Sequence, residues 1–167
     1  MKRSLFLLVA LILFSGVRLQ AQDSYRNPAQ KGVSLIVEGF AGAGTYPGVG
    51  GVIGYHFGPG FFAGAGANVK IGGGTQGSFV PFYADFRASF GDRRWAPYVG
   101  VDLGAVAAYP HDSWQNPSIR PFTSLSLGAR MRNRDVARRS SLWLAAIVES
   151  SWPSDLFFLG ARIGYSF

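Results

Sequence analysis

The sequence has no cysteine, few charged residues and no apolar run long enough for a membrane-spanning helix. Without cysteine, the chain can form neither a disulfide nor a lipid-modified cysteine anchor. Its longest apolar stretch, Leu5 to Phe14, is much shorter than the roughly 20 residues that a transmembrane helix needs. Two histidines, far apart in the chain, give no spacing signature for a metal site. Glycine and phenylalanine are abundant instead, with 23 and 14 residues.

The N-terminus has the three parts of a secretory signal peptide. Lys2 and Arg3 form a basic start, Leu5 to Phe14 form the apolar core, and polar residues follow before Ala21. We predict a signal peptide over residues 1–21, cleaved after Ala21, and a polar periplasmic lead-in over residues 22–31. The remaining residues, 32–167, are predicted to form a single domain.

Removal of the signal peptide leaves a modest basic excess of 13 basic over 9 acidic residues. The basic residues form no stripe with interleaved aromatics, so a nucleic-acid partner is not expected. Much of the excess lies in one segment, which we interpret as a solvated turn, with contact to anionic lipid head groups or a periplasmic partner as the alternative. Its arginines are Arg132, Arg134, Arg138 and Arg139.

From residue 32 onward, apolar and polar residues alternate with a period of two. This period is typical of a β-strand whose two faces lie in different environments. Turn residues divide this part of the chain into segments of the length that crosses a bilayer at a tilt. The predicted strands are 32–44, 49–57, 61–71, 79–90, 97–109, 121–132, 141–151 and 156–167. Prolines fall in connections or at strand starts, as for Pro97 and Pro121, and only Pro81 lies inside a predicted strand.

Eight charged residues lie within the predicted strands where apolar and polar residues alternate, and all eight share one face of their strand. They are Glu38, Lys70, Asp85, Arg87, Asp102, Arg130, Glu149 and Arg162. The opposite face carries no charge, whereas a soluble sandwich would present lysine and glutamate on its outer face. We therefore interpret the apolar face as lipid-facing, and the charged residues as an ion-paired network that plugs the lumen of a narrow barrel.

The last strand alternates up to its end, where Ile163, Tyr165 and Phe167 share the apolar face. An aromatic C-terminal residue that closes an alternating strand is the assembly signal of bacterial outer-membrane β-barrels, which this segment resembles. After the signal peptide the chain resembles the small, porin-like, eight-stranded outer-membrane barrels of the OmpA/OmpX type. The resemblance implies an all-β fold, an eight-stranded antiparallel up-and-down transmembrane β-barrel. It also implies insertion by the outer-membrane barrel assembly machinery, with periplasmic chaperones on the way.

Such a barrel has both termini in the periplasm, and aromatic residues near its boundaries with water. The residues predicted to form the periplasmic aromatic girdle are Tyr55, Phe57, Phe61, Phe90, Tyr165 and Phe167. The partners expected for this barrel are outer-membrane lipids, and we expect it to be a monomer.

A search for catalytic chemistry yields weak candidates. His111, Asp112 and Ser113 are neighbours in the longest loop, but sequence adjacency does not provide the geometry of a catalytic triad. His56 falls on the charged face, where it is interpreted as a member of the interior network, with a catalytic pairing to Glu38 or Glu149 as the alternative. The glycine-rich loop 72–78 lacks the lysine and the helix that a phosphate-binding loop requires. We therefore expect no catalysis, no cofactor and no metal.

Three classes of function remain open. The first is a non-catalytic barrel with a structural or surface-interaction role in the bacterial outer membrane. The second is a narrow channel or transporter for small solutes. The third is an envelope enzyme that modifies lipid, and a soluble lipocalin-like binder is a more distant alternative.

Overall fold

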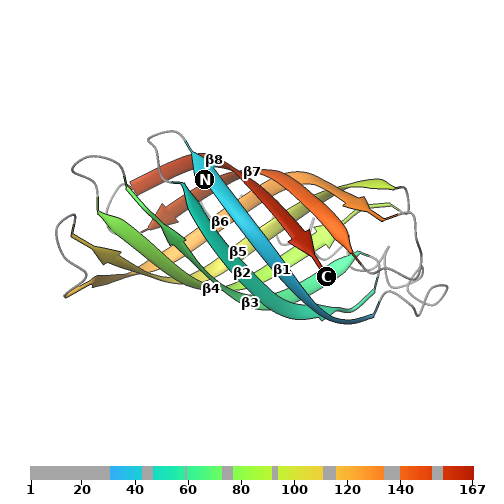
Figure 1. Ribbon diagram of the computed structural model, residues 1–167, viewed down its shortest axis with the longest axis horizontal. Coiled ribbons are helices and arrows are strands. Elements are labelled where there is room, and N and C mark those ends of the chain that lie inside the picture. The colour runs from blue at the N-terminus through green and yellow to red at the C-terminus, as the bar shows by residue number, and fades with distance from the viewer. Residues whose placement is uncertain are drawn as a thin grey trace, which may run out of the picture.

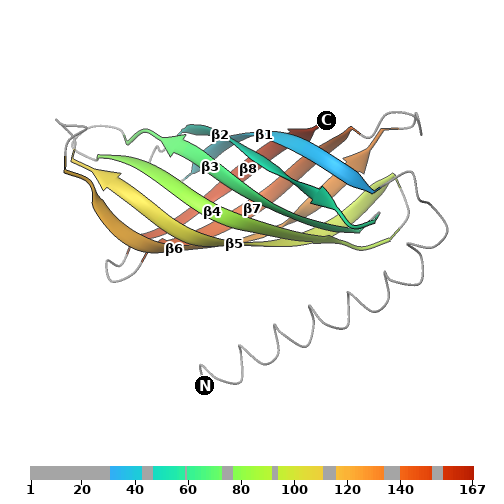
Figure 2. The same ribbon diagram turned by 90° about the horizontal axis from the view of Figure 1, so that it is seen from below.

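In the computed structural model, the residues described are 31–42, 47–58, 60–72, 77–91, 94–110, 116–133, 140–151 and 156–167, with the side chains of Leu156 and Phe157 excepted. The predicted signal peptide and nearly all of the lead-in lie outside these ranges. Eight antiparallel strands form a closed barrel, and they run at a tilt to its long axis (Figures 1 and 2). They are β1 (Gly32–Gly42), β2 (Gly48–His56), β3 (Phe61–Lys70), β4 (Ser78–Ser89), β5 (Trp95–Tyr109), β6 (Ser118–Arg132), β7 (Ser141–Ser151) and β8 (Leu156–Ser166).

Each strand pairs with the next along the chain, and β8 pairs with β1 to close the sheet. The closing ladder runs from Ile36 opposite Ser166 to Gly42 opposite Gly160. Near it, the Phe167 N–H donates to the Leu35 carbonyl oxygen at 2.9 Å. The predicted fold class, an eight-stranded antiparallel barrel, is confirmed. We call the end where β1 begins and β8 ends the proximal end, and the opposite end the distal end.

The structure corrects the predicted position of two prolines. β5 begins at Trp95 and β6 at Ser118, so Pro97 and Pro121 lie inside strands and do not open them. Proline lacks the N–H that a ladder needs, and a closed barrel offers no free edge. The barrel tolerates them because each is paired on one side only. Pro97 lies one residue beyond the β4–β5 ladder, and Pro121 lies one residue beyond the β6–β7 ladder. The ladder between β3 and β4 is likewise interrupted at Pro81.

The two faces of the sheet have opposite polarity to those of a soluble barrel. Asp85, Asp102 and Arg162 are at most 2% exposed, and they point into the lumen. On the outer wall, by contrast, Leu127 is 66% exposed and Ile163 is 53% exposed. The outer surface is therefore an apolar band that fits the hydrocarbon of a bilayer. Among the described residues, no helix is long and apolar enough to cross a membrane.

Glycines on the inner wall make room for a large aromatic side chain. Gly54 of β2 lies opposite Gly64 of β3. A Cβ placed on Gly54 would lie 2.4 Å from the Ala63 carbonyl oxygen and 2.6 Å from Cζ of Phe62, which leaves no room for a side chain. The Phe62 ring thus covers the two glycines and fills the space that their missing side chains leave.

Candidate functional site: the lumen and the aromatic belt

A cluster of buried charges occupies the middle of the lumen. Arg87 forms ion pairs with Glu38 of β1 and with Asp85 of its own strand. Its Nε also donates to both carboxylate oxygens of Asp85, at 3.0 Å each. Strand alternation explains the Asp85–Arg87 contact, because residues two apart in a strand point to the same face. The Glu38 contact crosses the barrel interior.

Arg162 of β8 extends this cluster to the opposite wall. It forms an ion pair with Asp102 of β5, and its Nε lies 3.9 Å from Oε2 of Glu38. The Tyr83 hydroxyl donates to the same Glu38 oxygen at 3.4 Å. Five charged residues from four strands are thus joined through Glu38. Because burial of a charge is costly unless it is paired, the cluster ties the walls of the barrel together.

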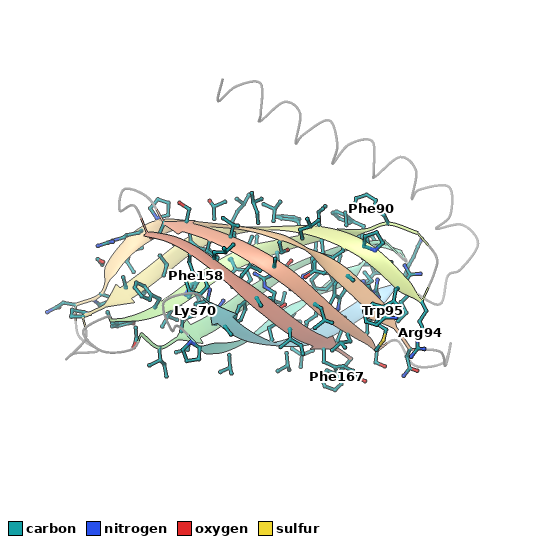
Figure 3. The ribbon with its side chains drawn as sticks, turned by 90° about the horizontal axis from the view of Figure 1, so that it is seen from above. Lys70, Phe90, Arg94, Trp95, Phe158 and Phe167 are labelled. Atoms are coloured by element: carbon teal, nitrogen blue, oxygen red, sulfur yellow. The ribbon has the colours of Figure 1, made fainter. Side chains whose placement is uncertain are left out.

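A second ion pair lies toward the distal end of the lumen. Lys70, the last residue of β3, forms an ion pair with Glu149 of β7. The Lys70 Nζ also lies 4.8 Å from the ring centre of Phe40 and 5.0 Å from that of Phe158 (Figure 3). Both rings are within the range of cation–π attraction. The Lys70–Glu149 pair and its two aromatic neighbours fill the lumen on the distal side of the central cluster.

Aromatic side chains fill the proximal half of the lumen around Trp143 of β7. The centre of the indole ring lies 5.1 Å from the guanidinium carbon of Arg87 and 4.8 Å from that of Arg130. The Tyr98 ring meets it edge-on at 4.9 Å, and the His56 ring stacks on it at 6.5 Å. Arg130 is held in place by its Nε, which donates to the Ser141 hydroxyl at 3.0 Å.

The structure places all eight charged residues predicted for the lumen network inside the barrel, each at most 6% exposed. Seven of them take part in ion pairs, and Arg130 contacts Ser141 and Trp143. The sequence analysis missed the large aromatic side chains that share the lumen with these charges. They are Phe62, Tyr98, Phe122 and Trp143. Their signal was available, because they have the same strand parity as the charged residues.

The six residues predicted for the girdle lie at the proximal end, at or near the ends of β2, β3, β4 and β8. Phe57 is 52% exposed and Phe167 is 62% exposed, and their rings contact Tyr55 and Tyr165 respectively. Trp95 is exposed at the same end (Figure 3), although the predicted strand 97–109 does not include it. It was missed because β5 begins two residues earlier than predicted. We call these seven outward-facing residues the aromatic belt.

Other sequence candidates lie outside the described residues, namely His111, Asp112, Ser113, Arg134, Arg138 and Arg139. His56 is buried, and its ring lies 4.9 Å from that of Phe62. Within the described part of the chain, no group of three or more histidine, aspartate or glutamate side chains could hold a metal ion.

Truncation of Trp143 to alanine is expected to lower the free energy of unfolding by about 3–5 kcal/mol, as for other large buried aromatics. The indole is 1% exposed and contacts two arginines, so its loss removes packing and cation–π contacts together. Urea titration of the barrel folded into lipid vesicles measures the change. Trp143→Phe is the control, since it keeps an aromatic ring beside the two arginines and should lose less than half as much. Equal losses for both variants would contradict a role for the ring.

Comparison with solved structures identifies this architecture. The N-terminal β-barrel domain of OprF from Pseudomonas aeruginosa matches with a TM-score of 0.55 and 15% identity, covering 81% of this chain and 95% of that one. Neisserial surface protein A matches with a TM-score of 0.51 and 11% identity, covering 80% and 92%. The chain has the fold of the eight-stranded outer-membrane β-barrels. The outer-membrane enzyme PagL is a further structural neighbour of this barrel, with a TM-score of 0.48 and 16% identity, covering 80% of this chain and 98% of that one.

At these identities the likeness is one of fold, so the role of the barrel has to be argued from its own residues. No protein-family model matches the sequence, and no curated protein matches it.

Proposed function

We propose that the protein is a monomeric, non-catalytic barrel of the bacterial outer membrane, with a structural or surface-interaction role and a lumen closed to solutes. The membrane placement is supported by the apolar outer wall and by the shared fold of outer-membrane barrels. The observation that carries the closed lumen is the succession of side-chain layers across it. From the distal to the proximal end these are the Lys70–Glu149 pair, the cluster around Glu38, and the group formed by Trp143 with Tyr98, His56 and Arg130, which we call the Trp143 layer.

The closed lumen follows from the width of an eight-stranded barrel. An interior of this size is just wide enough for side chains to fill. Here the side chains that fill it are among the largest in the chain, including Trp143, Arg87, Arg162 and Tyr98, all of which are fully buried. A path for a solute would have to separate ion pairs that hold opposite walls together.

The absence of catalysis is part of the proposal. A catalytic histidine needs a substrate within hydrogen-bond reach. His56 is 6% exposed and lies between the rings of Phe62 and Trp143, inside the lumen and away from the lipid. Replacement of His111 and Ser113 tests the remaining enzymatic candidate. Lipid profiles of cells expressing the double variant should be the same as those of the wild type, and a difference would contradict the proposal.

The closed lumen predicts that the purified barrel gives no steady single-channel openings in planar bilayers. The ion pairs and the Trp143 layer block the lumen, so bilayer current should stay at the level of protein-free membranes. The folded state of the inserted protein is checked by heat-modifiable gel mobility, which also reports a detergent-stable barrel. Steady openings from protein that passes this check would overturn the closed lumen and favour the channel alternative.

The proposal includes assembly by the outer-membrane machinery, for which Ile163, Tyr165 and Phe167 are the predicted signal. All three side chains are exposed on the outer wall. The chain end is also part of the closing seam, where the Ser34 hydroxyl donates to the Phe167 carbonyl oxygen at 2.9 Å. Ile163 and Tyr165 thus belong to β8, whose pairing with β1 completes the barrel, and Phe167 directly follows that strand.

A further inference from the structure

A polar pocket of about 270 Å³ opens at the proximal end of the barrel, between β5 and β8. The polar residues that line it are Arg94, Arg132, Asn133, Ser140 and Ser141. The Arg94 side chain is exposed, and no hydrogen-bond or ion-pair partner of its guanidinium is found in the part of the chain that the structure describes. Arg132 is fixed at the rim, where its Nη2 donates to the Gly91 carbonyl oxygen at 3.2 Å.

The other side of this pocket is apolar and belongs to the outer wall. Its residues Met131, Leu142 and Tyr165 are cross-strand neighbours on β6, β7 and β8. Trp95 of the aromatic belt, labelled in Figure 3, pairs with Met131 on the next strand. Tyrosine and tryptophan concentrate at the level of lipid head groups. The pocket therefore combines a basic rim with an apolar wall at the depth where a phosphate group meets its acyl chains.

A second hollow, of about 570 Å³, lies in the outer wall over β1, β6, β7 and β8. Its floor includes small outward-facing residues, Gly39, Ala41, Ala146 and Ala161. Larger exposed side chains border it, namely Leu127, Leu144 and Ile163. Small residues lower the surface of a membrane protein locally, so that an apolar chain can approach the backbone closely.

The polar pocket and the hollow lie in line on the same strands. On β8, Tyr165 lines the pocket and Ala161 lines the hollow, and on β7 the corresponding residues are Leu142 and Ala146. Four residues of strand span roughly 13 Å. That length is close to half of the ~30 Å hydrocarbon core of a bilayer. One acyl chain that starts at the pocket would therefore reach the hollow.

We propose that the wall over β6, β7 and β8 binds one anionic phospholipid, with its phosphate in the pocket at Arg94 and one acyl chain in the hollow. Arginine binds phosphate through paired N–H donors, and basic pockets at the membrane boundary bind lipid head groups. Among the residues that the structure describes, none that lines the pocket is acidic. The inference rests on the membrane placement of the barrel, and it is independent of whether the lumen conducts.

The test uses the full mature barrel in detergent, titrated with phosphatidylglycerol or phosphatidylcholine and observed by native mass spectrometry. The wild type should retain one phosphatidylglycerol in preference to phosphatidylcholine. Arg94→Gln should lower phosphatidylglycerol binding about fivefold, because each basic residue near the surface contributes roughly that factor. Lys31→Gln is the matched control, since Lys31 is exposed at the same end but does not line the pocket.

The hollow is tested separately by Ala146→Phe, which fills it from the outer face. This variant should weaken binding of both lipids, while Ala65→Phe, at an exposed outer-wall position of β3, should not. Equal retention of the two lipids by the wild type would overturn the phosphate site. Equal losses for Arg94→Gln and Lys31→Gln would overturn it as well, and equal losses for the two phenylalanine variants would overturn the acyl-chain groove. The closed lumen is tested by single-channel recording and the lipid site by mass spectrometry. Either proposal can therefore be contradicted while the other stands.

Discussion

Replacement of Arg87 by leucine is expected to lower the free energy of unfolding by about 3–5 kcal/mol, the usual cost of breaking a buried ion pair by removing one partner. Arg87 is 1% exposed and is paired with Glu38 and Asp85, which are equally buried. Without the guanidinium, Asp85 loses its ion-pair partner. Glu38 keeps the hydrogen bond from Tyr83 and the longer ionic contact with Arg162, at 3.9 Å. The loss should appear in urea titrations of the barrel in lipid vesicles.

The cause of this loss can be separated from the loss of side-chain volume. The triple variant Arg87→Leu, Glu38→Gln, Asp85→Asn removes the two carboxylate charges that the single variant leaves behind. Replacement of a complete buried ion pair by well-packed hydrophobic residues is often close to neutral. The triple variant leaves neutral amides in place of the carboxylates, so it should recover part of the lost free energy. If the triple variant is less stable than Arg87→Leu alone, the cluster does not act through charge compensation. Heat-modifiable mobility confirms in each case that the barrel has formed.

The architecture could be predicted from the sequence because one physical rule acts on every strand. A residue in a narrow membrane barrel faces either lipid or lumen, and the period of two records that choice along the chain. The eight charged lumen residues were found in this way, since a charge on the lipid face is expensive. Strand starts were less predictable. The predicted strand 97–109 begins at Pro97, because proline favours a strand start, and it therefore leaves out Trp95, where β5 begins.

The internal arrangement of the lumen could not be read from the alternation. The parity of Glu38 and Arg87 shows that both point inward, but they lie on β1 and β4, and their contact depends on the stagger of the closed sheet. The same limit applies to the Trp143 layer, which collects residues from β2, β5, β6 and β7. The lipid-binding surface could be predicted only in part. The arginine segment around Arg132 suggests contact with lipid head groups, but the pocket and the hollow arise where neighbouring strands, from β5 round to β1, come together.

Replacement of Leu125 on the outer wall by arginine is expected to lower the free energy of unfolding by about 2–4 kcal/mol, as for a cation near the bilayer midplane. Leu125 lies in the middle of β6, opposite Val101 of β5 and Val148 of β7, and it is 51% exposed. Ile119→Arg, six residues nearer the distal end of the same strand, is the matched control. It should lose about 0–1 kcal/mol, because the cost falls toward the interface.

The comparison of these two positions tests the orientation on which the membrane assignment depends. If the outer wall faced water, an arginine at Leu125 would replace an exposed apolar side chain with a soluble one, and stability would change little at either position. If it faces lipid, the loss must follow depth, with Leu125→Arg more destabilising than Ile119→Arg. The measurement is urea unfolding from lipid vesicles, and a thicker bilayer should increase the loss at Ile119 because that position then lies deeper in hydrocarbon. Equal losses at the two positions in both bilayers would show that the exposed apolar wall is not a lipid-facing surface.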